Sequence, residues 1–387
     1  EILSRPAGQA ELIVDFDVLN AATLESNYLS INATVNLMHI GIKTKVGAVS
    51  LFANLKSNFD FNYNEDLIEF LANGNSNFVG ETIDFSGNRI KYEAFHEIGI
   101  GYVHKFLCKR LTVGTRIKRV TGMFHASIQE RAIGTLATDA TDFVWTVNLE
   151  NASANTAGLD YLFNSDNYNV KDFTKYLVNN ENSTIAFDIG VKFKVLEWLK
   201  LEAAINDIGS INWKEQTRNY NLYDTTVIFR GVELEGIENS NQVLEDSLTN
   251  KFRSDETRLA FSSNLPTRVF LTASAYLTPN DRFSLTCFQR NVLERMPANY
   301  ALSYNHRFQK FVVGLVGFYR GDNNEMNIGA NVGTNFGPVQ LFAATDNFLV
   351  LNKPETHSKA DFRIGLNLLF GYKKWKKKDD FVNLDGL

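Results

Sequence analysis

Apolar and polar residues alternate one by one, in segment after segment, between Leu29 and Tyr372. In the stretch from Met326 to Phe336, for example, Met326, Ile328 and Val332 alternate with asparagines and glycines. Neighbouring side chains on a β-strand point to opposite faces, so each segment predicts a strand with one apolar and one polar face. Such strands, closed into a cylinder, make a wall suited to lipid outside and water inside. The pattern therefore predicts an all-β fold, a transmembrane antiparallel β-barrel.

The alternation predicts thirteen strands: Leu29 to Val46, Ala48 to Phe61, Glu93 to Phe106, Leu111 to Ile128, Ile185 to Val195, Leu199 to Ile208, Arg268 to Leu277, Phe283 to Asn291, Tyr300 to Phe308, Val312 to Arg320, Met326 to Phe336, Val339 to Asp346 and Asp361 to Tyr372. Single-chain bacterial barrels have an even number of strands. Residue 1 is Glu, and we expect a processed or truncated start with one further N-terminal strand outside the numbering. The expected total is about fourteen strands.

Short and long connections alternate along the chain. Gln309-Lys310 and Gly337-Pro338 are tight turns, whereas the connections on either side of them are longer and polar. Outer-membrane barrels have short periplasmic turns and longer extracellular loops, so the rhythm predicts the orientation. We expect three long, structured extracellular loops that fold over the barrel mouth or plug it, at Asn62 to Tyr92, Gln129 to Thr184 and Gly209 to Thr267.

These loops contain local signals of their own. Short helices are expected at Asp66 to Gly74 with Asp66 as the N-cap, at Val170 to Val178 and at Asn241 to Leu248. Strand-like pieces occur at Phe143 to Leu149 and at Val227 to Val232. The chain thus divides into a barrel, residues 1–372, and a basic, then acidic, periplasmic tail, residues 373–387. The tail either contacts anionic headgroups or is simply solvated.

Composition does not separate a membrane barrel from a soluble protein. The 387 residues are 44% hydrophobic and 21% charged, with a net charge of -5 and a mean hydropathy of -0.19. A barrel hides half of each strand in a polar lumen, which explains a soluble-looking average. The 12% aromatic content would supply interfacial girdles. No apolar run reaches the length of a helical membrane span. A soluble β-sandwich is the alternative, but only six prolines and markedly unequal turns disfavour it.

No catalytic, cofactor or metal motif stands out. The six histidines are scattered without metal-ligand spacing, and Cys108 and Cys287 are expected to be unpaired. His96 and Glu97 are the most suggestive pair, but adjacent strand residues face opposite sides and cannot readily share a site. We therefore expect a protein that is not an enzyme, with no catalytic, cofactor-binding or metal-binding residues and no cofactors.

Charged residues gather on the predicted lumen faces: Lys43, Lys45, Lys56, Glu97, Lys105, Arg116, Lys118, Asp188, Lys192, Lys194, Glu202 and Arg363. They would either line a pore that selects solutes by charge or form an ion-paired network that fills the lumen. Because both signs occur, the sequence favours the network. The negative net charge and the dispersed basic residues argue against nucleic acid as a partner.

Four segments carry a resemblance to a known family. They are DLIEFLANGNSNFVGETIDFSG, YEAFHEIGIGYVHKF, LTVGTRIKRVTG and LPTRVFLTASAYLTPNDRFSL, starting at Asp66, Tyr92, Leu111 and Leu265. The chain resembles an uncharacterised family of Bacteroidota outer-membrane β-barrels, a domain of unknown function. At the level of the fold, that family is distantly similar to fatty-acid-transporter-like barrels of fourteen strands, including PorV-type barrels of the type 9 secretion system.

The resemblance implies a location in the bacterial outer membrane, in contact with outer-membrane lipid, more than an activity. It suggests a non-enzymatic accessory subunit of a larger outer-membrane complex, for example of type 9 secretion or gliding machinery, with outer-membrane or periplasmic proteins as partners. The alternative is a passive transporter of hydrophobic or small solutes. Shared fold is a weak guide to either role.

Overall fold

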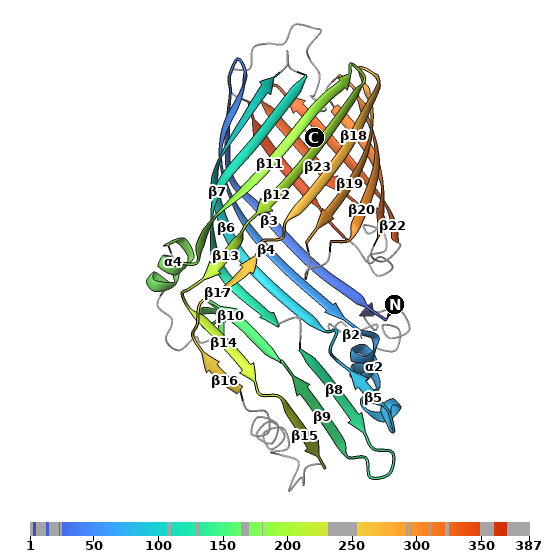
Figure 1. The fold of residues 1–387 in the computed structure, drawn as a ribbon. Coiled ribbons are helices and arrows are strands. Elements are labelled where there is room, and N and C mark those ends of the chain that lie inside the picture. Colours follow the sequence, from blue (N-terminus) through green and yellow to red (C-terminus); the bar gives the residue numbers. More distant parts are fainter. Residues whose placement is uncertain are drawn as a thin grey trace.

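The architecture was obtained as a computed structural model. It describes residues 3–4, 13–14, 23, 25–106, 110–128, 132–163, 170–179, 181–230, 254–291, 293, 296–309, 311–321, 325–348 and 360–369. These residues are almost entirely antiparallel β, which confirms the predicted fold class. The largest sheet curls into a barrel, with folded extensions below one end (Figure 1).

The barrel wall is a continuous antiparallel run within a sixteen-stranded sheet. In pairing order it comprises β3 (Asn27–Lys43), β4 (Gly47–Tyr63), β6 (Arg89–Phe106), β7 (Leu111–Ile128), β11 (Ser183–Leu196), β12 (Leu199–Ile208), β18 (Arg268–Thr278), β19 (Asp281–Arg290), β20 (Ala298–Arg307), β21 (Phe311–Arg320), β22 (Glu325–Phe336), β23 (Val339–Thr345) and β24 (Arg363–Leu368). Each strand pairs with the next, and β3 and β24 form the two ends of the run.

These thirteen strands are the thirteen that the alternation predicts, with ends that differ by at most four residues. The predicted end of the last strand, residues 370–372, lies outside the described residues. The short connections lie at the upper end of the barrel and the longer ones at the lower end (Figure 1), as the rhythm of the sequence predicts. The fourteenth, N-terminal strand stays a prediction. The basic and acidic tail, residues 373–387, lies outside the described residues.

Four neighbouring strands continue beyond the rest of the barrel. β3, β4, β6 and β7 have 17 or 18 residues, whereas β12 and β19 to β21 have 10. The ladder branches along β7, because residues 111–121 pair with β11 while residues 125–128 pair with β10 (Ser153–Ala157). β14 (Thr217–Leu222) and β16 (Ser254–Thr257) continue the sheet from β10. One side of the wall therefore extends past the barrel mouth.

The long loops contain further ordered structure. β5 (Thr82–Asp84), β8 (Ile133–Thr138), β9 (Trp145–Glu150) and β15 (Thr225–Phe229) form a separate four-stranded sheet. It has its own core of Phe78, Ile83 and Leu136, against which Phe70 and Trp145 pack. A two-stranded ladder joins β13 (Ser210–Trp213) to β17 (Phe261–Asn264), and another joins β1 (Leu3–Ser4) to β2 (Ile13–Val14). The expected strand-like pieces correspond to β9 and β15, whereas the sequence did not single out the other loop strands.

The helices lie in the same loops. α2 (Glu65–Asn73) and α4 (Val170–Asn179) confirm two predicted helices, and η1 (Ser76–Phe78) and α3 (Asp160–Phe163) are short additions. The N-cap of α2 is Asn64, whose side chain accepts a hydrogen bond from the Leu67 amide, so the assignment of Asp66 as the cap was wrong. Asp66 instead accepts a hydrogen bond from the Asp84 amide. The predicted helix at Asn241 to Leu248 lies outside the described residues. Within the described chain, no helix is long and apolar enough to cross a membrane.

The two faces of the wall differ as the alternation requires. Outward-facing Ile117, Leu285 and Ile328 are 54%, 55% and 49% exposed. Their neighbours Lys118 and Ser284, which face inward, are buried. In a soluble protein isoleucine is usually buried and lysine exposed, whereas in this wall lysine lies inside and isoleucine outside.

Candidate functional site

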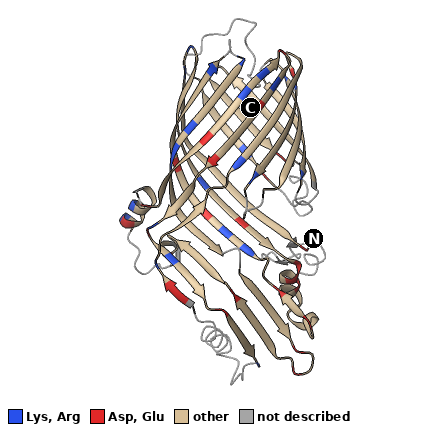
Figure 2. Ribbon diagram, viewed as in Figure 1, with Lys and Arg blue, Asp and Glu red and all other residues tan. Residues whose placement is uncertain are grey.

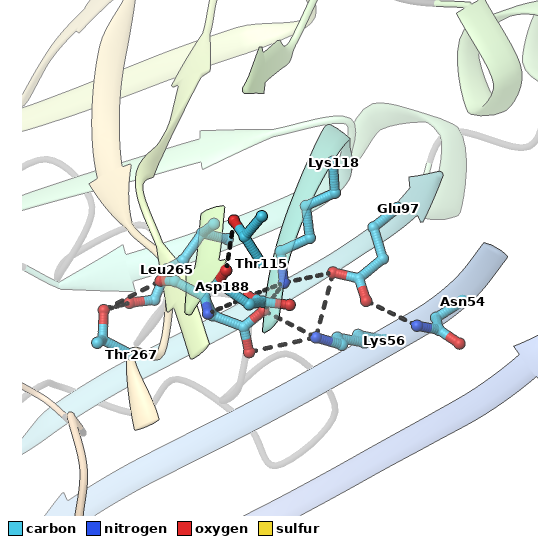
Figure 3. Close-up of polar contacts among 9 residues, drawn as sticks. Asn54, Lys56, Glu97, Thr115, Lys118, Asp188, Leu265 and Thr267 are labelled. Carbon is cyan, nitrogen blue, oxygen red and sulfur yellow. Dashed lines mark hydrogen bonds and ion pairs between the residues drawn. The ribbon is translucent and has the colours of Figure 1, made fainter. Parts of the chain in front are cut away.

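Five charged side chains from five strands converge inside the barrel (Figure 3). Lys56 Nζ lies 3.2 Å from Glu97 Oε2 and 2.9 Å from Asp207 Oδ1. Lys118 Nζ lies 3.2 Å from Glu97 Oε2 and 2.8 Å from Asp188 Oδ1, and it also pairs with Asp207. Two ammonium groups thus share three carboxylates. We call these five residues the lumen network.

Strand register brings the lumen network together. Asn54 and Glu97 are partners on the β4 and β6 ladder, and the Asn54 amide donates to Glu97 Oε1 over 2.7 Å. Lys56 and Lys118 occupy inward positions on β4 and β7. Each member comes from a different strand, so the network ties β4, β6, β7, β11 and β12 together from the inside.

Asp207 reaches the network only because of a bulge. Simple alternation places it with Leu201 and Ile205 on the outward face of β12. The register between β11 and β12 shifts between Phe187 and Ile189, and Asp207 adopts a positive φ of 60°. Its amide donates to Asp188 Oδ1 over 2.8 Å, and its carboxylate turns inward. Bulges commonly re-aim a side chain in this way.

The lumen network is buried. All five side chains are less than 10% exposed. Formal charges of +2 and -3 leave one negative charge, and inward-facing Arg268 interacts electrostatically with Asp207 and Glu97. Buried charges are tolerated when they are paired in this way, and removing one partner leaves an uncompensated charge at high cost.

A second ion pair crosses the lumen between strands on opposite sides. Arg290 on β19 donates to Asp60 on β4, with Nη2 3.0 Å from Oδ2, and to Ser30 Oγ on β3 over 3.1 Å. Six steps of the pairing order separate β4 from β19 in a run of thirteen strands. The Arg290 and Asp60 side chains are 14% and 6% exposed. Opposite walls therefore touch through a shielded salt bridge.

A hydrophobic roof closes the same region. Ile211 and Trp213 of β13, with Leu265, pack on Phe95 and Val120 in a fully buried cluster. Trp213 Nε1 donates to Ser263 Oγ over 2.9 Å. Phe95 and Val120 are inward residues of β6 and β7, so the two ends of the Gly209 to Thr267 loop, around β13 and β17, fold into the mouth of the barrel, as expected for this loop.

Beyond the network, toward the long-loop end, lies a row of polar inward residues. His125 Nε2 is 2.9 Å from Ser127 Oγ, and Glu93, the ladder partner of His125, pairs with Lys91 over 3.1 Å. A base bonded to a hydroxyl is one element of nucleophilic catalysis. His125 Nδ1 has no hydrogen-bond partner among the described residues, however, and the ring packs between Trp213 and Phe261, with centroids 5.0 and 5.2 Å away. Among the described residues no cluster of three or more His, Cys, Asp or Glu side chains could hold a metal ion.

The structure separates the charged residues that the sequence placed in the lumen. Lys56, Glu97, Lys118 and Asp188 meet in the lumen network, and Lys192 pairs with Glu202 over 2.9 Å in a half-exposed position nearer the short-turn end. Arg116 stacks over the Phe52 ring, and Lys194 pairs with the turn residue Glu197. Arg363 pairs with Asp346 and Asp361. Lys43, Lys45 and Lys105 are exposed near the short turns. Sequence reasoning missed Asp60, Asp207, Arg268 and Arg290.

Other expectations have clear outcomes. Glu97 enters the lumen network whereas His96 lies on the opposite, outward face beside Leu177, so the two do not share a site. Cys287 is a free thiol, as predicted, and Cys108 lies outside the described residues. The glycines on β21 and β22 allow close packing: a Cβ on Gly314 would lie 2.2 Å from Asn305 Oδ1 and 2.6 Å from Asn331 Nδ2.

Comparisons with known proteins identify a family and a few distantly similar solved structures. The model of a family of unknown function, DUF5723, matches residues 4–346. No curated protein matches the chain by sequence. The toluene transporter TodX of Pseudomonas putida is similar at 7% identity over 84% of each chain, with a TM-score of 0.35. The ferric-catecholate import receptor Fiu of E. coli K12 is similar at 9% identity over 89% of this chain and 64% of its own, with a TM-score of 0.28. Similarity this distant says nothing about function.

Proposed function

This chain belongs to the family of unknown function DUF5723, and from its geometry we propose that it is an integral outer-membrane β-barrel with a closed lumen. It serves as a non-enzymatic accessory subunit of a larger outer-membrane complex, for example of secretion or gliding machinery. The observation that carries the proposal is the set of buried ion pairs that join the barrel walls across the lumen.

The dimensions and surface of the wall support a membrane location. Ten-residue strands such as β12 and β20 are ~33 Å long at ~3.3 Å per residue, and a tilt of ~40° reduces their height to ~25 Å. That height equals the apolar band of an outer-membrane barrel, about 25 Å. Aromatic side chains face outward near the short turns, including Tyr102, Phe311 and Phe336. An apolar surface of this size favours lipid over water.

The lumen supports a structural rather than a conducting role. A conducting pore keeps its charged lining hydrated, whereas Lys118, Glu97 and Asp207 are buried and form ion pairs with one another. Toward the long-loop end, Trp213 and its neighbours cover the mouth. The lumen network and the pair of Arg290 with Asp60 stiffen the wall, and their charges are paired with one another rather than open to a solute.

The extension supplies a surface for partners. β3, β4, β6 and β7 exceed the ten residues of the shorter strands by seven or eight, about 23 Å or slightly more at ~3.3 Å per residue. They carry the four-stranded sheet with its own core beyond the mouth (Figure 1). A barrel needs no such layer to remain in a membrane, so we assign it to binding another outer-membrane protein at the long-loop end.

Two measurements test the proposal. Affinity purification from mildly solubilised membranes should recover stoichiometric partners. A variant in which a Gly-Ser linker replaces residues 132–150, which carry β8 and β9, should lose them. Retention of the heat-modifiable gel shift would show that the variant barrel is intact. A monodisperse monomer in every mild detergent, or partner recovery unaffected by the replacement, would count against the subunit role.

A passive transporter is the second candidate, favoured by one specific feature. Phe270, Phe288 and Phe318 form an inward aromatic row with ring centroids 6.0 and 5.4 Å apart. Such a row could guide an apolar solute along the wall. Fatty-acid uptake by proteoliposomes, compared with protein-free vesicles, tests this candidate. Uptake that depends on the three rings would favour it over the closed barrel.

A further inference from the structure

The outward face of the barrel wall is almost free of charge. Among the described strand residues that face outward, formally charged side chains occur at Arg119 and Asp281. Asp281 begins β19 beside a tight turn and accepts a hydrogen bond from Tyr304 Oη over 2.7 Å. Arg119 is exposed and lies toward the opposite end of the wall, with Nη2 3.5 Å from Ser183 Oγ. A charge on a lipid-facing surface is costly at mid-membrane and cheap only near the interfaces.

The position of Arg119 fits the outer interface. It follows Leu111, at the short-turn end of β7, by eight residues, or ~26 Å along the strand at ~3.3 Å per residue. With a tilt of ~40° the height is ~20 Å, close to the far edge of an apolar band about 25 Å tall. Outward Ile117 and Ile100 lie nearer the short turns, and Ile98 and Ile185 flank Arg119 on the neighbouring strands. The next outward pair is His96 and Thr121, so Arg119 lies at the last level of the apolar belt on this part of the wall.

Helix α4 lies on the outer face just beyond Arg119, and it projects from the wall below the barrel (Figure 2). Phe173 and Leu177 of the helix pack against the cluster of Ala94, Met123 and Phe124, and Tyr176 Oη donates to the Met123 carbonyl over 2.7 Å. The outward ring of His96 interacts with the Leu177 backbone and with the charge of Arg119. Arg119 and the helix are therefore neighbours.

The other side of α4 is basic and partly apolar. Lys171 and Lys175 are one turn apart and exposed, on the side opposite Phe173 and Leu177. Val170 and Val178 are 67% and 66% exposed. The acidic helix residue Asp172 lies on another side of α4, where its charge acts on Tyr161. Glu215, which is outside the helix, acts on the same tyrosine. The exposed ridge thus combines two ammonium groups with apolar side chains, the pattern of a helix at a membrane interface.

We propose that Arg119, Lys171 and Lys175 bind the phosphate groups of a phosphorylated glycolipid in the outer leaflet. This inference rests on the proposed membrane location. The guanidinium of Arg119 can hold phosphate oxygens in a bidentate manner, and the lysines add point charges. Val170 and Val178 meet the acyl boundary. The patch lies where the apolar belt ends, which is where lipid headgroups lie, so a lipid fits it better than a soluble anion or a protein.

The test compares variants in vesicles of phosphatidylcholine containing a tenth of fluorescent lipid A. The triple variant Arg119→Gln, Lys171→Gln, Lys175→Gln should lose at least tenfold in lipid A affinity, measured by energy transfer from protein tryptophans. Arg116→Gln removes an inward charge from the same strand and is the matched control, with no expected loss. Dephosphorylated lipid A should bind the wild type as weakly as phosphorylated lipid A binds the triple variant.

The outcomes separate the two proposals. If the wild type inserts into the vesicles but binds phosphorylated and dephosphorylated lipid A equally, the headgroup site is refuted and the barrel stands. Equal affinity of wild type and triple variant refutes it as well. If phosphatidylglycerol competes as strongly as lipid A, a general anionic-lipid surface replaces the glycolipid site. If the wild type does not insert at all, the membrane location itself fails.

Discussion

Replacing Lys118 with Met tests the energetic claim about the lumen network most directly. Lys118 Nζ contacts three carboxylates, those of Glu97, Asp188 and Asp207, and its side chain is 1% exposed. Methionine has a similar length, so the change removes a charge and leaves little cavity. The network then holds one lysine against three carboxylates, and its formal charge changes from -1 to -2. Breaking a buried pair in this way costs about 3 to 5 kcal/mol.

The assay is equilibrium urea unfolding in lipid vesicles, followed by tryptophan fluorescence. Lys192→Met is the control, because its pair with Glu202 is half-exposed and should cost less than about 1 kcal/mol. The double variant Lys118→Met, Asp207→Asn restores the charge balance and should recover part of the loss, with a coupling energy of about 1 to 3 kcal/mol. A cost for Lys118→Met no larger than for Lys192→Met, with no coupling, would refute the view that the network stabilises the wall.

Three further predictions concern the closure of the barrel and the docking of α4. Arg290→Met leaves the buried Asp60 carboxylate unpaired. The variant should give measurable conductance in planar bilayers, where the wild type gives none. If neither protein conducts, this salt bridge does not close the lumen. Trp213→Ala empties a fully buried site and should cost about 3 to 5 kcal/mol and expose the loop to protease, whereas an unchanged digestion pattern would contradict the proposed roof. Burial raises the pKa of the Tyr176 hydroxyl, so the folded state favours the neutral phenol. Its contribution to stability is complete below the ordinary pKa of 10.0 and falls as pH rises above it, so protease cleavage of α4 should increase above about pH 10. Tyr176→Phe should abolish that pH dependence, and a dependence that persists would assign it to another group.

Several features of the fold could be read from local sequence. Alternation with a period of two reports which side of a strand faces an apolar environment, and it needs no knowledge of the strand's partners. For that reason β7 and β12 match the sequence prediction to the residue. The α4 helix begins at the predicted residue and ends one residue later than predicted, because its pattern is contained within ten residues.

The loop strands could not be read in the same way. β13 and β17 have four residues each and pair across about fifty residues of chain. Segments so short carry too few positions for a period to emerge, and their stability comes from packing on Phe95 and Val120. The N-cap of α2 was misplaced for a related reason. Both Asn64 and Asp66 are suitable caps, but the side chain of Asp66 accepts a hydrogen bond from the Asp84 amide of β5, and Asn64 caps the helix.

The amino-acid sequence by itself determined the strands, their apolar and polar faces, and the presence of charges of both signs in the lumen. Only the tertiary structure decided which charges meet. Arg290 and Asp60 are 230 positions apart and touch because the curvature of the wall brings β19 opposite β4. Asp207 turns inward because of a bulge whose cause lies in its pairing with β11. Which side of the wall a side chain faces is a local property of its strand. Which side chains meet across the lumen depends on the register and the closure of the barrel, and these depend on all strands of the sheet together.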